Sequence, residues 1–257
     1  MAEFSPKFKE ALSLVQKPGR YTGGEPGCVY KDKSRVDVRM AFCFPDTYEI
    51  GMSNIGMRIL YGLMNEMPGV WCERVFAPWG DMEAEMRKHA IPLYALESHD
   101  PVKAFDLIAF TIGYEMSYTN ILNMLELSCV PLLAREREGL ENIVFAGGVC
   151  AVNPEPLADF IDFFSLGEGE EITKEIIDCY RQAKKDGCTK QEFLLRVSKI
   201  DGVYVPSFYE HTYNEDGTLA AIRPKNGAPA RVRKRIMQDM DKSYFPTKTI
   251  VPSTEIV

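Results

Sequence analysis

Long apolar runs are missing from this chain of 257 residues. No run approaches the roughly 20 apolar residues that cross a bilayer. The first residues, MAEFSPKFKEALSLVQKPGR, also lack the apolar stretch of a secretory signal. We therefore expect a cytoplasmic protein without a membrane partner. The net charge of −7 disfavours non-specific nucleic-acid binding by the surface as a whole.

Closely spaced cysteines are missing as well. None of the seven cysteines is separated from another by only two or three residues, which argues against a disulfide framework, a zinc knuckle or a C-x3-C-x2-C cluster motif. The only histidines are His89, His99 and His211, and none belongs to a D-x-H-x-x-G sequence or a recognisable catalytic arrangement. We predict no catalytic residue and no metal ligand in this sequence.

The chain does contain an alternation of strand-like and helical segments, in a composition that is 46% hydrophobic and 26% charged. Buried-strand patterns cover 36–44, 71–76, 91–95, 106–112, 142–146 and 161–166. Helical patterns cover 53–67, 81–89, 117–128, 156–160 and 169–185. Strands that are apolar on both faces and alternate with helices indicate an α/β fold with a doubly wound, Rossmann-like parallel sheet. Right-handed crossovers then bring the carboxyl ends of the strands to one edge, where such sheets bind ligands.

The pattern changes beyond Gly187. Residues 203–213 and 219–223 are strand-like, and the Asn214–Gly217 sequence between them predicts a hairpin. We divide the chain into an N-terminal extension (1–35), the α/β domain (36–187), a small α+β extension with the hairpin (188–238) and a linker (239–257).

A basic segment follows the predicted hairpin turn. Residues 217–238 hold no acidic residue and six basic ones, which are Arg223, Lys225, Arg231, Arg233, Lys234 and Arg235. These side chains could bind RNA or another anionic substrate. A solvated linker is the alternative, and the sequence leaves both open.

The first loop at the predicted carboxyl edge contains Asp46 and Tyr48 and leads to Ser53 and Asn54. Free backbone N–H groups at a helix start suit an anion, although Ser53 and Asn54 could serve only as caps. The stretch GMSNIGMR has P-loop glycine spacing, but Met57 occupies the position of the phosphate-binding lysine. An NTPase is therefore excluded.

Three further loops belong to the same predicted edge. Tyr114 could stack on a planar cofactor or only cover the sheet end. Gly147 and Gly148 allow a ligand to approach the backbone closely, but a tight strand-to-helix turn needs them equally. The acidic loop Gly167-Glu168-Gly169 suits a helix start and disfavours a phosphate there.

Four segments together resemble a known family. They are PDTYEIGMSNIGMRILYGLMNE (45–66), FTIGYEMSYTNILNMLELS (110–128), FAGGVCAVNPEPLADFIDFFSLGEGEE (145–171) and VPSTEIV (251–257). In this order they are similar to the N-terminal region of uncharacterised radical SAM proteins, whose domain resembles cobalamin-binding domains. VPSTEIV resembles the segment that precedes the cluster-binding cysteines and the partial barrel.

The resemblance implies a larger enzyme in which a [4Fe-4S] cluster cleaves S-adenosylmethionine, with the cluster cysteines outside residues 1–257. This chain would then be a non-catalytic domain that faces a cofactor or substrate and packs on the barrel of the same protein. The resemblance implies a cofactor-binding edge built from Asp46, Tyr48, Ser53, Asn54, Tyr114, Gly147, Gly148, Gly167, Glu168 and Gly169. Cobalamin is a candidate ligand, and the missing D-x-H-x-x-G weakens that candidate. A vestigial module that binds nothing and shapes the substrate channel is the alternative. The sequence does not reveal substrate, reaction or oligomeric state.

Overall fold

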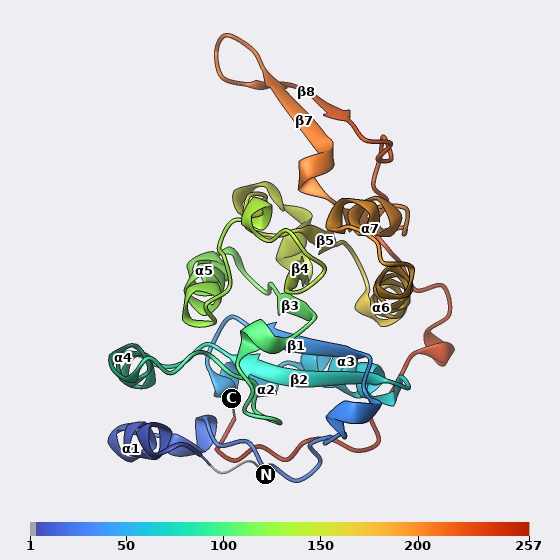
Figure 1. Cartoon of the computed structure of the whole chain (residues 1–257). Coiled ribbons are helices and arrows are strands. Elements are labelled where there is room, and N and C mark those ends of the chain that lie inside the picture. Colours follow the sequence, from blue (N-terminus) through green and yellow to red (C-terminus); the bar gives the residue numbers. More distant parts are fainter. Residues whose placement is uncertain (1–3, 257) are drawn as a thin grey trace.

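A mostly parallel six-stranded sheet forms the centre of the protein, which we describe from a computed structural model over residues 4–256 (Figure 1). The strand order is β2-β1-β3-β4-β5-β6, and only β6 runs antiparallel to its neighbour. A separate two-stranded sheet pairs β7 with β8. The strands are β1 (Val38–Phe44), β2 (Val70–Phe76), β3 (Leu107–Thr111), β4 (Ile143–Gly147), β5 (Phe163–Ser165), β6 (Val203–Tyr204), β7 (Tyr209–Tyr213) and β8 (Leu219–Pro224).

Helices cover both faces of the large sheet. Figure 1 shows α3 and α6 on one face and α4 and α5 on the other. The helices are α1 (Pro6–Leu14), α2 (Tyr48–Ser53), α3 (Ile55–Glu66), α4 (Gly80–His89), α5 (Tyr118–Leu127), α6 (Gly169–Asp186) and α7 (Lys190–Val197). This arrangement confirms the predicted α/β fold with a Rossmann-like sheet and a small hairpin. Within residues 4–256, no helix is long and apolar enough to cross a bilayer.

Two predicted strands differ from the structure. Residues 91–95 form no strand, because Pro92 lacks an N–H group and the Leu93 N–H donates to the end of α5 at Leu127 (2.9 Å). Only an isolated bridge from Tyr94 to Pro101 remains there. The run 203–213 is divided at Pro206, so that its first part joins the large sheet as β6 and its second part becomes β7.

Helix boundaries near two loops also differ from expectation. Ser53 does not start a helix: it ends α2, and its hydroxyl donates to the Glu49 carbonyl. Asn54 caps α3 instead, accepting from the Met57 N–H (2.9 Å). The short helix expected at 156–160 is replaced by two 3-10 turns, Val149–Val152 and Glu155–Leu157.

The two ends of the described chain are packed on the α/β domain. Phe8 of α1 and Ile250 both belong to the single hydrophobic core. In Figure 1 the C-terminal segment leaves the hairpin, passes α6 and α3, and returns beneath the sheet to the N-terminal segment. The Val251 N–H donates to the Pro26 carbonyl there (2.8 Å). Residues 1–3 and 257, the outermost parts of the predicted extension and linker, lie outside the described residues.

A buried charge cluster joins these ends to the edge strand β2. Arg74 on β2 donates to both carboxylate oxygens of Glu25 (2.9 and 2.8 Å) and to Glu97 (2.7 Å). Glu25 also accepts from the Tyr48 hydroxyl (2.8 Å), which in turn accepts from the Ser253 N–H (2.9 Å). All seven residues of β2 are buried, so the cluster and its cover protect an edge that would otherwise be exposed.

Candidate ligand-binding slot

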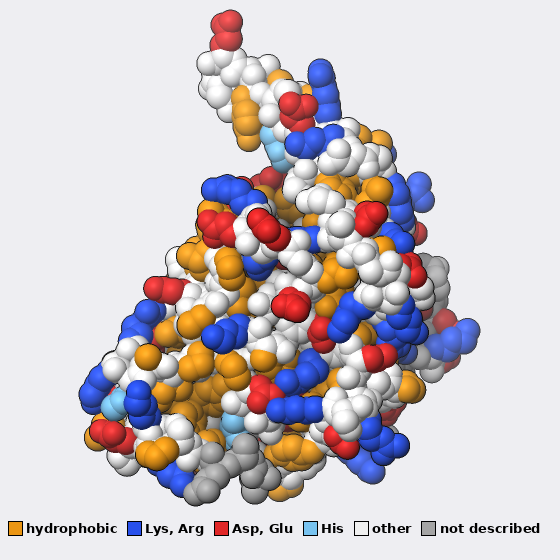
Figure 2. All heavy atoms as spheres, viewed as in Figure 1, with side chains coloured by type: hydrophobic (Ala, Val, Ile, Leu, Met, Phe, Trp, Pro, Cys, Tyr) orange, Lys and Arg blue, Asp and Glu red, His pale blue; other side chains and the backbone are white. Residues whose placement is uncertain are grey.

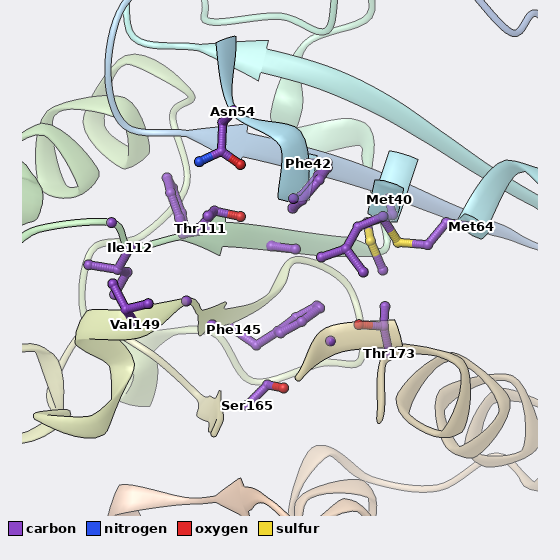
Figure 3. Close-up of a pocket in the computed structure, with 18 of the residues that line it drawn as sticks. Met40, Phe42, Asn54, Met64, Thr111, Ile112, Phe145, Val149, Ser165 and Thr173 are labelled. Atoms are coloured by element: carbon purple, nitrogen blue, oxygen red, sulfur yellow. The ribbon is translucent and has the colours of Figure 1, made fainter. Parts of the chain in front are cut away.

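A narrow cavity of about 330 Å³ lies between the sheet and helices α3 and α6 (Figure 3). It extends across β1 and β3, where the strand order reverses direction and where open α/β sheets bind ligands. Figure 3 shows Met40 and Met64 at one end, and Ile112 and Val149 at the other. We call this cavity the slot.

The floor of the slot is built by alternate strand residues, which point to one face of the sheet. Ala109 on β3 lies between Phe42 on β1 and Phe145 on β4 in the strand register. One step further toward the carboxyl edge, Thr111 is paired with Gly147. Small side chains on the two middle strands therefore leave a hollow between two phenylalanine rings.

The walls come from helix positions spaced four residues apart, which share one helical face. On α3 these positions are Gly56, Leu60 and Met64, and on α6 they are Gly169 and Thr173. A Cβ atom at Gly169 would lie 3.1 Å from the Leu60 methyl groups. Glycine at this position thus lets α6 approach α3 closely beside the slot.

No charged side chain lines the slot within the described residues. Its polar side chains are those of Asn54, Thr111, Ser165 and Thr173. The arrangement suits an uncharged, mainly apolar group and disfavours a bare phosphate or carboxylate, which would lose its hydration without gaining an opposite charge.

Five of the sequence-predicted residues line this slot: Asn54, Gly147, Gly148, Gly167 and Gly169. Gly148 has φ of 102°, and a Cβ atom there would lie 2.6 Å from the Ile112 carbonyl oxygen. Gly167 has φ of 110° and contacts the Arg235 backbone, with which it forms a parallel bridge. The fold therefore requires glycine at both positions.

The predicted pair Asp46 and Tyr114 lies outside the slot. The Tyr114 hydroxyl donates to the Asp46 carboxylate, so the loops after β1 and β3 are joined across the carboxyl edge. This hydrogen bond, together with partial burial, raises the pKa of Tyr114 to about 12. Tyr114 accordingly joins a neighbouring loop and does not line the slot.

Tyr48, Ser53 and Glu168 do not line the slot either. Tyr48 is buried in the charge cluster around Arg74, and burial raises its pKa to about 12. The Glu168 carboxylate accepts from the Met237 N–H of the C-terminal segment. Tyr48 and Glu168 therefore hold distant chain segments together, a role that their positions in loops did not reveal.

The floor and most of the walls of the slot were not predicted from the sequence. Strand residues 107–111 and 143–147 read as continuous apolar runs, so nothing separated slot-facing positions from core-facing ones. Two weak signals were present. Thr173 is a polar residue on the apolar face of α6, and Gly56, Leu60 and Met64 repeat every four residues.

Exposed apolar side chains follow three of the strands that build the slot. Ile55, the first residue of α3, is 70% exposed, Met116 in the turn after β3 is 86% exposed, and Val149, which lines the slot after β4, is 74% exposed. We call these side chains the apolar rim. Val152, in the same turn as Val149, is also exposed. Clustered exposed hydrophobic side chains of this size are typical of a surface that a partner or ligand covers.

The three histidines lie away from the slot. His89 ends α4 beside Glu85, the His99 ring donates from Nε2 to the Thr22 carbonyl (2.9 Å), and His211 on β7 faces Glu155. Within residues 4–256, no group of three or more His, Cys, Asp or Glu side chains is arranged to hold a metal ion.

The basic segment is only partly available to a ligand. Arg235 forms ion pairs with Glu171 and Glu175 on α6, which fasten the C-terminal segment. The other five basic side chains are exposed and have no partner in the described part of the chain: Arg223, Lys225, Arg231, Arg233 and Lys234. Figure 2 shows basic side chains around the projecting hairpin. Binding of RNA or another anion there stays a prediction.

Comparisons with known proteins extend the sequence analysis. Residues 56–206, more than half of the chain, match a family described as the N-terminal part of radical SAM proteins. An uncharacterised protein of Methanocaldococcus jannaschii is 25% identical over 221 residues, which cover 81% of this chain and 42% of that protein. The chain thus spans less than half the length of this relative. No solved structure matches.

Proposed function

Because the chain belongs to the family of N-terminal domains of radical SAM proteins, we propose that it holds a flat, uncharged part of a cofactor or substrate for a radical SAM barrel. The slot carries the proposal: it is an uncharged cavity of about 330 Å³ at the point where the strand order reverses. The chain itself supplies binding and orientation, and the radical chemistry belongs to the barrel.

The apolar rim supports a barrel on the same side. Val149 lines the slot, and Ile55 lies between the slot residues Asn54 and Gly56, so a domain that covers these two side chains would also enclose whatever occupies the slot.

Cobalamin is a candidate ligand of the slot. Its benzimidazole side group is flat and largely apolar, which matches a lining that contains two phenylalanine rings and several glycines. Gly148 and Gly169 would lie against it. No histidine lines the slot, so this chain offers no imidazole for cobalt there. Cobalamin supplies cobalt chemistry when it is bound, and the residues of the slot would orient its side group.

Titration of the purified chain with cobalamin tests this ligand. Binding is expected to change the visible spectrum and to retain corrinoid through gel filtration. A spectrum that stays unchanged at high micromolar cobalamin, with no corrinoid retained, would remove cobalamin as a ligand of this chain.

A second candidate function is a module that binds nothing and only packs on the barrel. The exposed rim favours it, because Met116 and Val149 suit protein docking whether or not the slot is filled. Glycine substitutions separate the two functions in a longer protein that contains the barrel. Gly147→Ala narrows the slot without altering the rim, so lost activity with intact assembly supports a ligand, and intact activity supports pure docking.

A further inference from the structure

Two hydroxyl groups that face the slot bond to no other residue of the described chain. Ser165, which ends β5, and Thr173 on α6 are each only 6% exposed. No described residue donates to or accepts from either hydroxyl. Figure 3 shows both side chains on the same side of the slot, near Phe145 and across from Asn54 and Phe42. Neither hydroxyl oxygen is fully buried, so both are accessible from the slot and can bond to a group that enters it.

Two hydroxyls at helix ends bond to the backbone instead. Ser128, which follows α5, donates to the Met124 carbonyl (2.6 Å), and Ser53 donates to the Glu49 carbonyl (2.7 Å), each four residues back. Thr173 is in a similar helical setting but makes no such bond. Its hydroxyl, like that of Ser165, is left available to the slot.

We propose that Ser165 and Thr173 recognise the polar edge of a flat nitrogen heterocycle that enters the slot. This inference rests on the proposed function, because it concerns the same cavity. The rings of Phe42 and Phe145 provide an apolar surface for the faces of the heterocycle. The hydroxyls supply a donor and an acceptor for its ring nitrogens, which a hydrocarbon ring of the same shape cannot use.

Methionine methyl groups provide a local probe of this binding. Met40 and Met64 both line the slot, so NMR of the whole chain with ¹³C-methyl methionine reports on its occupancy. The ligands are benzimidazole, at a pH where it is neutral, and indene, a hydrocarbon of nearly the same shape. Both are expected to shift the Met40 and Met64 signals, which are assigned by Met→Leu substitution.

The expected result is a change in the ratio of the two dissociation constants. Ser165→Ala and Thr173→Val should each weaken benzimidazole relative to indene by about tenfold, the usual effect of one hydrogen bond. Thr173→Ser, which keeps a hydroxyl, should restore most of the preference. Ser128→Ala is the matched control, because it removes a buried hydroxyl outside the slot, and it should leave the ratio unchanged.

Two other outcomes would contradict the proposals separately. If both ligands shift the Met40 and Met64 signals but the substitutions do not change the ratio of dissociation constants, the slot binds flat groups without recognition by the hydroxyls. If neither ligand shifts these signals while the variants remain folded, the slot itself is not a binding site, and the proposed function fails together with this inference.

Discussion

The charge cluster around Arg74 and the slot are both buried and both contain polar groups, but they treat those groups in opposite ways. Arg74, Glu25 and Glu97 satisfy one another with hydrogen bonds of 2.7–2.9 Å. In the slot, Ser165 and Thr173 have no partner in the described structure. The polar groups of the cluster bond to one another, and the two hydroxyls of the slot face the cavity.

The difference distinguishes polar side chains that hold the fold together from polar side chains that are available to a ligand. A buried ion pair that lost its partner would destabilise the fold severely, so the cluster that holds the chain ends must be self-sufficient. A neutral hydroxyl costs less to leave unpaired, and a ligand can complete it.

The largest effect is expected from Arg74→Met. It leaves Glu25 and Glu97 buried without a cation, so the free energy of unfolding should fall by about 3–5 kcal/mol. Denaturation with urea measures this change. Arg87→Met, which breaks exposed pairs with Glu83 and Glu126, is the control and should cost less than about 1 kcal/mol. Equal losses in the two variants would show that the cluster does not hold the fold.

Acid should weaken the same cluster. Burial acts to raise the pKa of Glu25, but the hydrogen bonds and charge of Arg74 outweigh it and hold this pKa at about 2. Because the folded pKa lies below the unfolded value near 4.5, the stabilisation is complete above pH 4.5 and is lost as pH falls toward 2. The loss should amount to roughly 3 kcal/mol.

Urea unfolding at several pH values measures that loss, and Glu25→Gln should remove most of it. Parallel pH profiles for the wild type and Glu25→Gln would contradict the assignment. The pKa of Glu73 is shifted in the opposite direction. Burial raises it to about 7, so protonation of Glu73 below pH 7 favours the folded state. Glu73→Gln separates this contribution.

A smaller effect is expected from a glycine of the slot. Gly148→Ala places a Cβ atom 2.6 Å from the Ile112 carbonyl in a backbone conformation with φ of 102°. The free energy of unfolding should fall by about 1–3 kcal/mol. Gly113→Ala, also in the slot lining but with no atom within 4 Å of the new methyl group, should be nearly neutral. Similar stabilities would show that the turn after β4 relaxes freely.

The smallest effect compares two serines. Ser128→Ala breaks a buried hydrogen bond and should cost about 1 kcal/mol, whereas Ser165→Ala removes an unpartnered hydroxyl and should cost nothing or stabilise the unliganded chain. Thermal unfolding of both variants without ligand measures the difference. A larger loss for Ser165→Ala would mean that its hydroxyl is already satisfied, for instance by bound water.

Much of the architecture was decided by the sequence alone. Apolar runs that alternate with helical patterns specify a parallel sheet covered on both faces, and the ends of the strands then share one edge. The glycines Gly147, Gly148, Gly167 and Gly169 were predicted at that edge, and all four line the slot. The residues that a turn requires depend on its local backbone, so they can be predicted from neighbouring residues in the sequence.

Only the tertiary structure decided which side chains meet. Tyr48 and Asp46 were predicted at a binding edge, but Tyr48 bonds to Glu25 and Ser253, and Asp46 bonds to Tyr114. These partners are distant in sequence, and a hydrogen bond between them depends on how whole segments pack. The slot has the same origin, because its hollow arises from the strand register that places Ala109 between Phe42 and Phe145.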